Sequence, residues 1–180
     1  MQLILFIILI IILIAICLSF LNAVWAANSL APWVPSIKRD LQRIFKLAAL
    51  KPNETFYDLG CGNGKVVFYA CKNFPVKAVG LEIFLPLFLI CKIRQFFHKG
   101  ANLTFKYKNL FKEDLSAADV VYVFGMPRAI KNKLKQKLER ELKPGSRVIS
   151  YTFPITGWVP EIIDKPNKGK LSIYLYKIKI

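Results

Sequence analysis

The chain has 180 residues, 54% of them hydrophobic, and its 27 basic against 11 acidic residues give a formal net charge of +16 at pH 7. Four cysteines without a C-x-x-C pair and a single histidine exclude the usual ligand sets of a structural zinc site, so no metal is expected. The thiols are expected to be free and reduced, as in a cytosolic domain. So basic a chain favours an anionic lipid leaflet or a nucleic acid as its partner.

Residues 1–27 are predicted to form a transmembrane anchor. From Met1 to Ile37 there is no Asp, Glu, Lys, Arg or His, and Leu3 to Ala27 is almost wholly apolar and long enough to span a bilayer. The alternative is a cleaved signal peptide, because Val24-Trp25-Ala26 offers small residues near a possible cut. Signal peptides normally begin with basic residues and have a shorter apolar run, so a retained anchor is favoured.

Residues 28–37 are expected to be a linker that Pro32 and Pro35 hold extended. Basic residues follow it at positions 38, 39, 43 and 46, so the positive-inside rule places the remainder of the chain in the cytoplasm. Residues 38–180 are enough for one compact domain.

A strand, a glycine-rich turn and a helix follow one another from Thr55 to Lys72. The apolar run Thr55 to Leu59 suits a buried strand, and Lys65 to Lys72 can be helical. Between them, Gly60, Gly62 and Gly64 stand at alternate positions, where a missing Cβ lets the backbone lie against a ligand. In doubly wound α/β proteins this turn lies at the carboxyl ends of the strands, where nucleotides bind.

Two common ligands do not fit this turn. A dinucleotide fingerprint requires a third glycine where Lys65 stands, and a P-loop requires Ser or Thr where Val66 stands. The remaining pattern is Asp-x-Gly-x-Gly-x-Gly from Asp58 to Gly64, which resembles motif I of class I S-adenosylmethionine (SAM) methyltransferases.

A carboxylate at the end of the next strand supports a nucleoside ligand. Glu82 ends the run Lys77 to Ile83, eighteen positions after Gly64. A Glu or Asp at about this distance accepts hydrogen bonds from both ribose hydroxyls. The alternative is a solvated glutamate at a strand end.

The later segments complete a βαβ pattern. Leu85 to Phe97 is expected to be a helix that is apolar nearly all round, which indicates either burial or membrane contact. The other expected elements are strands at Leu103–Tyr107, Val120–Phe124, Arg147–Thr152 and Leu171–Ile180, and a helix at Arg128–Leu142. This order predicts an α/β fold, a Rossmann-like open and mostly parallel sheet with an added terminal strand.

The helix predicted at Arg128–Leu142 carries most of the basic residues of its region. Its apolar seam consists of Ile130, Leu134, Leu138 and Leu142, and its other faces carry Lys131, Lys133, Lys135, Lys137 and Arg140. These cations form either a face for anionic lipid or a solvated surface. Nucleic acid is the less favoured partner, because the predicted anchor holds the domain at a membrane.

The chain also resembles a particular group of class I methyltransferases. The matching segments are Pro32 to Ser36, Leu50-Lys51-Pro52, Tyr57 to Val67, Val79 to Ile83, Ala118 to Val121, Glu141 to Gly145, Thr152 to Ile155 and Gly157-Trp158. They are similar to the membrane-anchored protein lysine methyltransferases of the adenine nucleotide translocase and the ATP synthase c subunit, and closer still to the bacterial relatives of these enzymes.

The resemblance implies SAM as the cofactor and a set of binding residues. Asp58 is expected near the amino acid end of SAM and Glu82 on the ribose. The other expected cofactor-binding residues are Gly60, Cys61, Gly62, Asn63, Gly64, Ile83, Asn109 and Leu110. Asn63 and Asn109 stand where the family commonly has Asp, and an asparagine carbonyl at position 109 can still accept from the adenine amino group.

The methyl acceptor is expected to meet apolar side chains after the fourth and fifth strands. The candidates are Phe124, Met126, Pro127, Tyr151, Phe153 and Trp158, and the alternative is that these side chains belong to the core. No catalytic base is assigned. Three hypotheses stay open: a methyltransferase for a lysine of a membrane protein, a methyltransferase for a quinone or lipid, and a non-catalytic membrane- or nucleic-acid-binding domain on this fold. Asp58, the glycines and Glu82 argue against the third.

Overall fold

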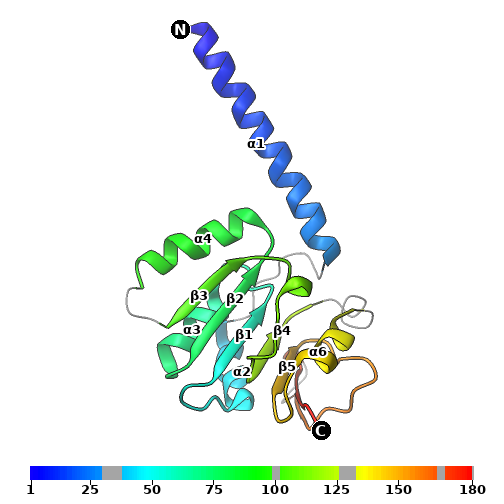
Figure 1. Cartoon of the computed structure of the whole chain (residues 1–180). Helices are drawn as coiled ribbons and strands as arrows, with labels where there is room; N and C mark the ends of the chain where they lie inside the picture. Colours follow the sequence, from blue (N-terminus) through cyan, green and yellow to red (C-terminus); the bar gives the residue numbers. More distant parts are fainter. Residues whose placement is uncertain (30–37, 99–101, 126–132, 166–168, 180) are drawn as a thin grey trace.

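The computed structural model describes residues 1–29, 38–98, 102–125, 133–165 and 169–179 (Figure 1). Most of the predicted linker, together with Met126 and Pro127, lies outside these residues. The described chain forms one long helix that projects from an α/β domain (Figure 1).

A seven-stranded sheet forms the centre of the domain, in the order β3-β2-β1-β4-β5-β7-β6. The strands are β1 Thr55–Leu59, β2 Lys77–Glu82, β3 Leu103–Tyr107, β4 Val120–Val123, β5 Arg147–Tyr151, β6 Ile162–Asp164 and β7 Ile173–Lys177. The first five pair in parallel, whereas β7 runs antiparallel to both β5 and β6. The predicted open parallel sheet with an added terminal strand is confirmed.

Helices cover both faces of the sheet. The covering helices are α2 Leu41–Ala48, α3 Lys65–Asn73, α4 Leu85–Phe96 and α6 Lys135–Glu141, whereas α1 Gln2–Ser29 is the helix that projects from the domain. The 3-10 turns are η1 Lys38–Asp40 and η2 Leu110–Lys112. Ile44 of α2, Val67 of α3 and Cys91 of α4 pack on one face with Phe56 of β1. On the other face Leu138 of α6 packs with alternate residues of the same strands. The central strands are buried on both faces, as parallel strands are.

Two details of the sequence prediction are wrong. Strand β6 was not expected, because its three residues are partly or largely exposed and their only strand partner is β7. Lys137 was placed on an outward basic face, but its side chain is buried and its Nζ donates to the carbonyl of Glu113 and to Glu141. A lysine stem is apolar enough to be buried when its ammonium finds such oxygen partners.

The projecting helix α1 is apolar throughout. Its segment Gln2–Leu21 has a mean hydropathy of 3.6 and is long enough to cross a membrane. A signal sequence near the N-terminus passes the same test of length and hydropathy, so the membrane anchor stays a prediction.

Candidate active site

The carboxyl ends of β1, β2, β4 and β5 meet at one edge of the sheet, because these strands run parallel in register. The loop of residues 60–64 crosses this edge. The backbone N–H groups of Gly60 and Cys61 both donate to the carbonyl of Leu81, at 3.0 and 2.8 Å. The loop is therefore held over the end of β2, where an α/β sheet of this kind binds its ligand.

The glycines of the loop are required by backbone geometry and by space. Gly60, Gly62 and Gly64 have φ angles of 84°, 56° and 76°, in the left-handed region that favours glycine. A Cβ on Gly64 would lie 2.7 Å from the ring of Phe105, and a Cβ on Gly80 would meet the same ring at 2.7 Å. The importance of Gly80, in the middle of β2, was not apparent from the sequence.

Glu82 connects the glycine loop to the start of α4. Its Oε2 accepts from the N–H of Gly62 at 2.7 Å, and its Oε1 accepts from Ile83 at 2.8 Å and Phe84 at 2.7 Å. Burial raises the pKa of this carboxyl, although the three backbone hydrogen bonds oppose the shift. A carboxylate oxygen has two lone pairs, so Glu82 keeps the capacity to accept from ribose hydroxyls.

Asp58 presents a buried carboxyl oxygen that no described residue satisfies. The residue is 2% exposed and Oδ2 has no hydrogen-bond partner among the described residues. Burial, and secondarily the charge of Glu82, raises the pKa of Asp58 well above its ordinary value. Such a group is costly unless a cation or donor meets it. The ammonium of an amino acid ligand has the required charge, so this part of the site fits SAM.

Two side chains of α4 also hold the glycine loop. Arg94 donates to the carbonyl of Asn63, and its guanidinium lies 4.4 Å from the ring centroid of Phe68. The thiol of Cys91 lies 3.1 Å from the carbonyl of Gly62 and donates to it. The sequence analysis missed both residues. The only arginine of a mostly apolar helix was the available signal.

Cys61 is a structural residue of the loop rather than a reactive one. Its side chain is buried, and burial, with the neighbouring Cys91 and Asp58, raises the pKa of the thiol well above its ordinary value. The thiol is therefore protonated at neutral pH and packs where Gly80 leaves room. Among the described residues, no three His, Cys, Asp or Glu side chains come together in a way that could hold a metal ion.

Asn109 and Leu110 follow β3 at the same edge of the sheet. The Oδ1 of Asn109 accepts from the N–H of Phe111 at 2.9 Å and so caps the turn η2. Leu110 is buried in the apolar cluster on the α6 face. Because the side-chain carbonyl of Asn109 accepts this hydrogen bond from Phe111, the orientation of its NH₂ group is fixed.

The predicted acceptor-pocket residues differ in their surroundings. Tyr151 is fully buried, its hydroxyl donates to Asp40 at 2.7 Å, and its ring packs against Phe124 at 4.9 Å. Phe153 packs against the α6-side cluster. Trp158 packs there too, and its Nε1 donates to Glu139 at 2.7 Å. The bond to Asp40 gives Tyr151 a structural role at the base of α2.

Thr152, directly after β5, has two unusual features. Its φ is 76°, which is rare for a β-branched residue, and its hydroxyl is buried without a hydrogen-bond partner among the described residues. The backbone is held there because the N–H donates to the carbonyl of Ser172 at 2.8 Å. Strain and an unsatisfied polar atom together mark functional positions in proteins. From the sequence, Thr152 was expected only to belong to a family-like segment, Thr152 to Ile155, and no role was predicted for it.

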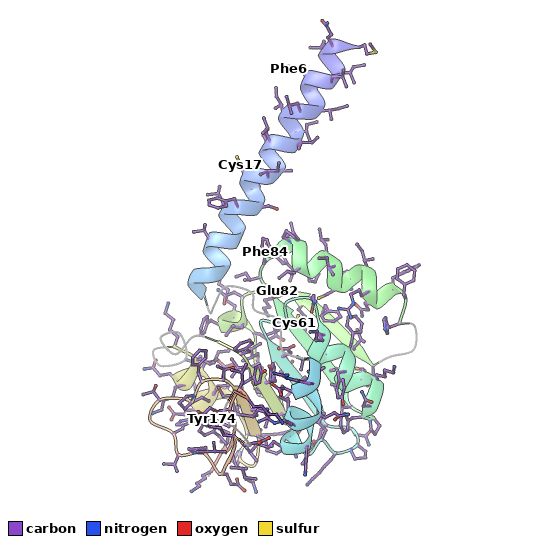
Figure 2. All side chains as sticks on the ribbon, turned by 180° about the vertical axis from the view of Figure 1, so that it is seen from behind. Phe6, Cys17, Cys61, Glu82, Phe84 and Tyr174 are labelled. Carbon is purple, nitrogen blue, oxygen red and sulfur yellow. The ribbon has the colours of Figure 1, made fainter. Side chains whose placement is uncertain are left out.

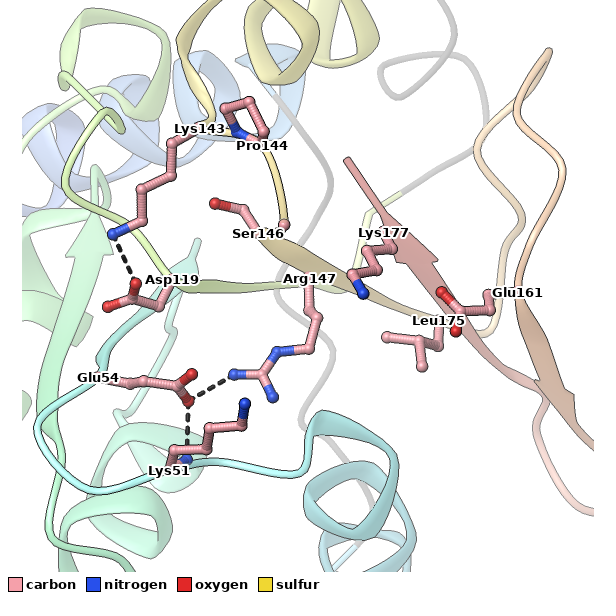
Figure 3. Close-up of a pocket in the computed structure, with 11 residues that line it drawn as sticks. Lys51, Glu54, Asp119, Lys143, Pro144, Ser146, Arg147, Glu161, Leu175 and Lys177 are labelled. Atoms are coloured by element: carbon pink, nitrogen blue, oxygen red, sulfur yellow. Dashed lines mark hydrogen bonds and ion pairs between the residues drawn. The ribbon is translucent and has the colours of Figure 1, made fainter. Parts of the chain in front are cut away.

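A pocket lies at the opposite, amino-terminal edge of the sheet. This pocket has a volume of about 420 Å³ (Figure 3). It is lined by Lys51, Glu54, Asp119, Lys143, Pro144, Gly145, Ser146, Arg147, Glu161, Leu175 and Lys177. Four of its charged side chains form two ion pairs, Lys143 with Asp119 at 2.6 Å and Arg147 with Glu54 (Figure 3).

The strand order, the glycine loop and the carboxylate at the end of β2 define a class I SAM-dependent methyltransferase. A solved RNA methyltransferase from Salinibacter ruber, in complex with S-adenosyl-L-homocysteine, has the same fold. Its TM-score is 0.75 at 29% identity, over 81% of this chain and 94% of that one. The putative methyltransferase yhhF from Escherichia coli shares the fold with a TM-score of 0.66 and 17% identity, over 82% of this chain and 89% of that one.

The family described as the ANTKMT methyltransferase domain matches residues 58–162, and the chain belongs to this family. A protein-lysine N-methyltransferase of Saccharolobus islandicus (strain REY15A) is 38% identical over 82% of this chain and 93% of its own length. The Rattus norvegicus lysine N-methyltransferase of the ATP synthase c subunit is 32% identical over 72% of this chain, which spans 59% of the rat enzyme. The chain is therefore an enzyme that uses SAM, as the resemblance predicted.

Proposed function

We propose that this enzyme transfers the methyl group of SAM to a lysine side chain of a membrane protein. The observation that carries the proposal is the likeness to the archaeal protein-lysine N-methyltransferase, which extends over nearly the whole length of that enzyme. Two further relatives, from rat and mouse, are named for the ATP synthase c subunit and the adenine nucleotide translocase. The apolar helix α1 supports the membrane part of the proposal.

In this proposal the residues of the carboxyl edge bind SAM. Asp58 accepts from the ammonium, which gives its unsatisfied Oδ2 a partner. Glu82 accepts from the ribose hydroxyls while it continues to hold the loop. Asn109 lies at the adenine. SAM supplies a methyl group on a positively charged sulfur, so the leaving group departs neutral.

The acceptor amine has to arrive without its proton. A lysine with an ordinary pKa of about 10.4 requires roughly 4–5 kcal/mol to deprotonate at neutral pH. An apolar pocket reduces this requirement because it disfavours the ammonium form. The histidine of the chain, His98, lies beyond α4, with its Nδ1 against the carbonyl of Arg94 and its ring 4.6 Å from that of Phe68. We infer that alignment and exclusion of water, rather than a general base, accelerate the transfer.

The tether determines which lysines are accessible. We propose that residues 1–27 are a single-pass anchor, residues 28–37 a short linker, and residues 38–180 a cytoplasmic methyltransferase domain. A short linker with two prolines keeps the domain close to the bilayer. The effective concentration of membrane-held substrates is raised accordingly, relative to that of soluble ones.

The test is a methyl-transfer assay with the full chain reconstituted in membranes and SAM labelled in its methyl group. The expected result is label in protein, recovered as methyllysine after acid hydrolysis, with none in the Asp58→Ala variant. Label in the lipid extract would instead support a quinone or lipid acceptor, and label in added RNA would support an RNA acceptor. Either outcome would overturn the lysine assignment without affecting the assignment of SAM.

A further inference from the structure

The outward face of α4 is apolar. Its exposed large side chains, between 41% and 76% accessible, are Leu85, Leu89, Ile90, Ile93, Phe96 and, just after the helix, Phe97. Leu87 and Cys91 point the other way and are buried in the domain. A helix on a soluble domain normally presents charged and polar side chains to water, so this helix has the opposite pattern.

These exposed side chains form one continuous surface. At 3.6 residues per turn they fall within about 140° of the helix circumference, directly opposite the buried residues. The polar residues lie beside this arc: Lys92 is exposed at one edge, and Arg94 at the other edge is bonded to the glycine loop. A contiguous apolar patch of this kind marks a contact with a protein or a membrane.

The position of α4 indicates which contact it makes. Helices α1 and α4 touch, and both lie on the side of the domain where the carboxyl edge of the sheet is found (Figure 1). From behind, α4 lies above the labelled Glu82 and Cys61, on the side from which α1 projects (Figure 2). The apolar face of α4 is thus continuous with a helix that is itself apolar and exposed.

We propose that α4 lies in the interface of the bilayer, with Leu89, Ile93 and Phe96 among the acyl chains. This inference rests on the proposed anchoring through α1. Lys92 lies at the edge of the apolar face, where a lysine stem reaches toward lipid headgroups. The contact turns the carboxyl edge of the sheet, with the SAM site, toward the membrane. A substrate lysine then lies at the membrane surface rather than deep in the cytoplasm.

The structure assigns this role to α4 rather than to α6, whose lysines were the sequence-based candidates for lipid contact. Lys137 is buried, Lys135 lies 3.7 Å from Glu139, and Arg140 is paired with Glu141. Few unpaired cations are therefore available on the described part of α6. By contrast, Leu89 and Ile93 on the apolar face of α4 are 49% and 61% exposed.

Spin labels on the full chain in lipid nanodiscs test the inference. One labelled cysteine at a time is placed at Cys17 in α1, at Ile93→Cys in α4, or at Lys72→Cys on α3. The other accessible native cysteines are replaced by serine, whereas Cys61 and Cys91 are buried and stay. Collision with oxygen, which concentrates in lipid, is compared with collision with a water-soluble nickel chelate.

The label at position 93 is expected to resemble the one at Cys17, with oxygen collisions several-fold more frequent than nickel collisions, while position 72 shows the reverse. Nickel accessibility at 93 with protection at 17 would overturn the inference but leave the anchor in place. Nickel accessibility at both would overturn both. Low accessibility to both reagents at 93, with spin–spin broadening, would show a second copy of the chain there and also overturn it.

Discussion

Both edges of the sheet contain buried or half-buried carboxylates, but the two edges differ in whether these carboxylates have partners. At the amino edge Asp119 accepts from Lys143 at 2.6 Å and from the N–H of Thr55 at 2.8 Å, and Glu54 is paired with Arg147. At the carboxyl edge Asp58 has a buried oxygen without a partner among the described residues. The amino edge has the clear hollow of about 420 Å³, yet its carboxylates Asp119 and Glu54 both have cationic partners.

The difference indicates that an unsatisfied buried group is a better guide to the candidate active site than a pocket is. Buried polar groups in proteins are normally paired, so an exception requires an explanation. The ion pairs of the amino edge stabilise the fold and leave little for a ligand. The carboxyl edge retains a destabilising group that a cationic ligand satisfies. To test this interpretation, each substitution of a carboxylate at the carboxyl edge is compared with the equivalent substitution at the amino edge.

The largest effect is expected for Glu82→Ala. The ribose hydroxyls lose a charged acceptor, so SAM binding should weaken by roughly 2–4 kcal/mol. The N–H of Gly62 also loses its acceptor, so the loop becomes less ordered. Titration calorimetry measures the affinity. Glu54→Ala at the amino edge is the matched control, and equal affinity of the Glu82 variant and wild type would refute the assignment.

Asp58→Asn should have a somewhat smaller effect on binding and an opposite effect on stability. The loss of a charge-assisted hydrogen bond should weaken SAM binding by about 1.5–3 kcal/mol. The ligand-free protein should be no less stable, because a buried carboxyl whose ionisation is disfavoured by burial is replaced by an amide that does not ionise. Asp119→Asn is the control: it should leave SAM affinity unchanged and lower the free energy of unfolding in urea. A destabilised Asp58→Asn would contradict this account.

The two carboxyls should also give opposite pH dependences. The pKa of Asp58 is raised in the folded state, so its contribution to stability falls as pH rises between the unfolded and folded pKa values. Burial opposes ionisation of Asp119, but Lys143 and the N–H of Thr55 lower its pKa, so its contribution is lost as pH falls. Each slope is at most about 1.4 kcal/mol per pH unit.

Urea unfolding over a pH series measures both slopes. Relative to wild type, Asp58→Asn should gain stability as pH rises, and Asp119→Asn should lose less stability than wild type as pH falls. Parallel curves for the Asp58 variant and wild type would show that this carboxyl is not perturbed.

The smallest effect on stability is expected for Thr152→Val. The shape of the side chain is kept and a buried hydroxyl without a partner is removed, so the free energy of unfolding should change by less than about 1 kcal/mol. If the hydroxyl meets the methyl acceptor, turnover should fall while SAM affinity does not. Unchanged turnover would assign Thr152 to the backbone turn alone. Ser150→Ala, in the adjoining strand β5, controls for loss of a hydroxyl that is already bonded to the carbonyl of Phe153.

Much of the fold follows from local patterns in the sequence. Strands were predicted from the sequence at the positions of β1 to β5, the glycine spacing predicted the loop after β1, and Glu82 was predicted at the end of the next strand. Strand β6 could not be predicted, because its residues are not buried and it exists through pairing with β7. Lys137 likewise depends on Glu113 and Glu141, and its pairing with Glu113 joins residues far apart in the sequence.

The parts of the candidate site that could be predicted are those where the residue type and spacing indicate one kind of contact. Asp58 and the three glycines were found from their spacing, but the contacts of Arg94 and Cys91 with the loop required the packing of α4 on it. The aromatic residues after β5 were ambiguous, since an aromatic side chain serves a core or a pocket equally well. Tyr151 shows why: its hydroxyl is bonded to Asp40, which is more than a hundred residues away.

Three contacts join α4 to the glycine loop, through Arg94, Cys91 and the carboxylate of Glu82 that holds both Gly62 and Phe84. If α4 lies in the bilayer interface, these contacts couple lipid binding at α4 to SAM binding at the loop, and a single coupling free energy describes both effects. Linkage is reciprocal, so if lipid around α4 raises the affinity for SAM, SAM strengthens the lipid contact by the same factor. We therefore expect the dissociation constant for SAM to change between detergent and nanodiscs in the wild type, and to change less in the Arg94→Ala variant.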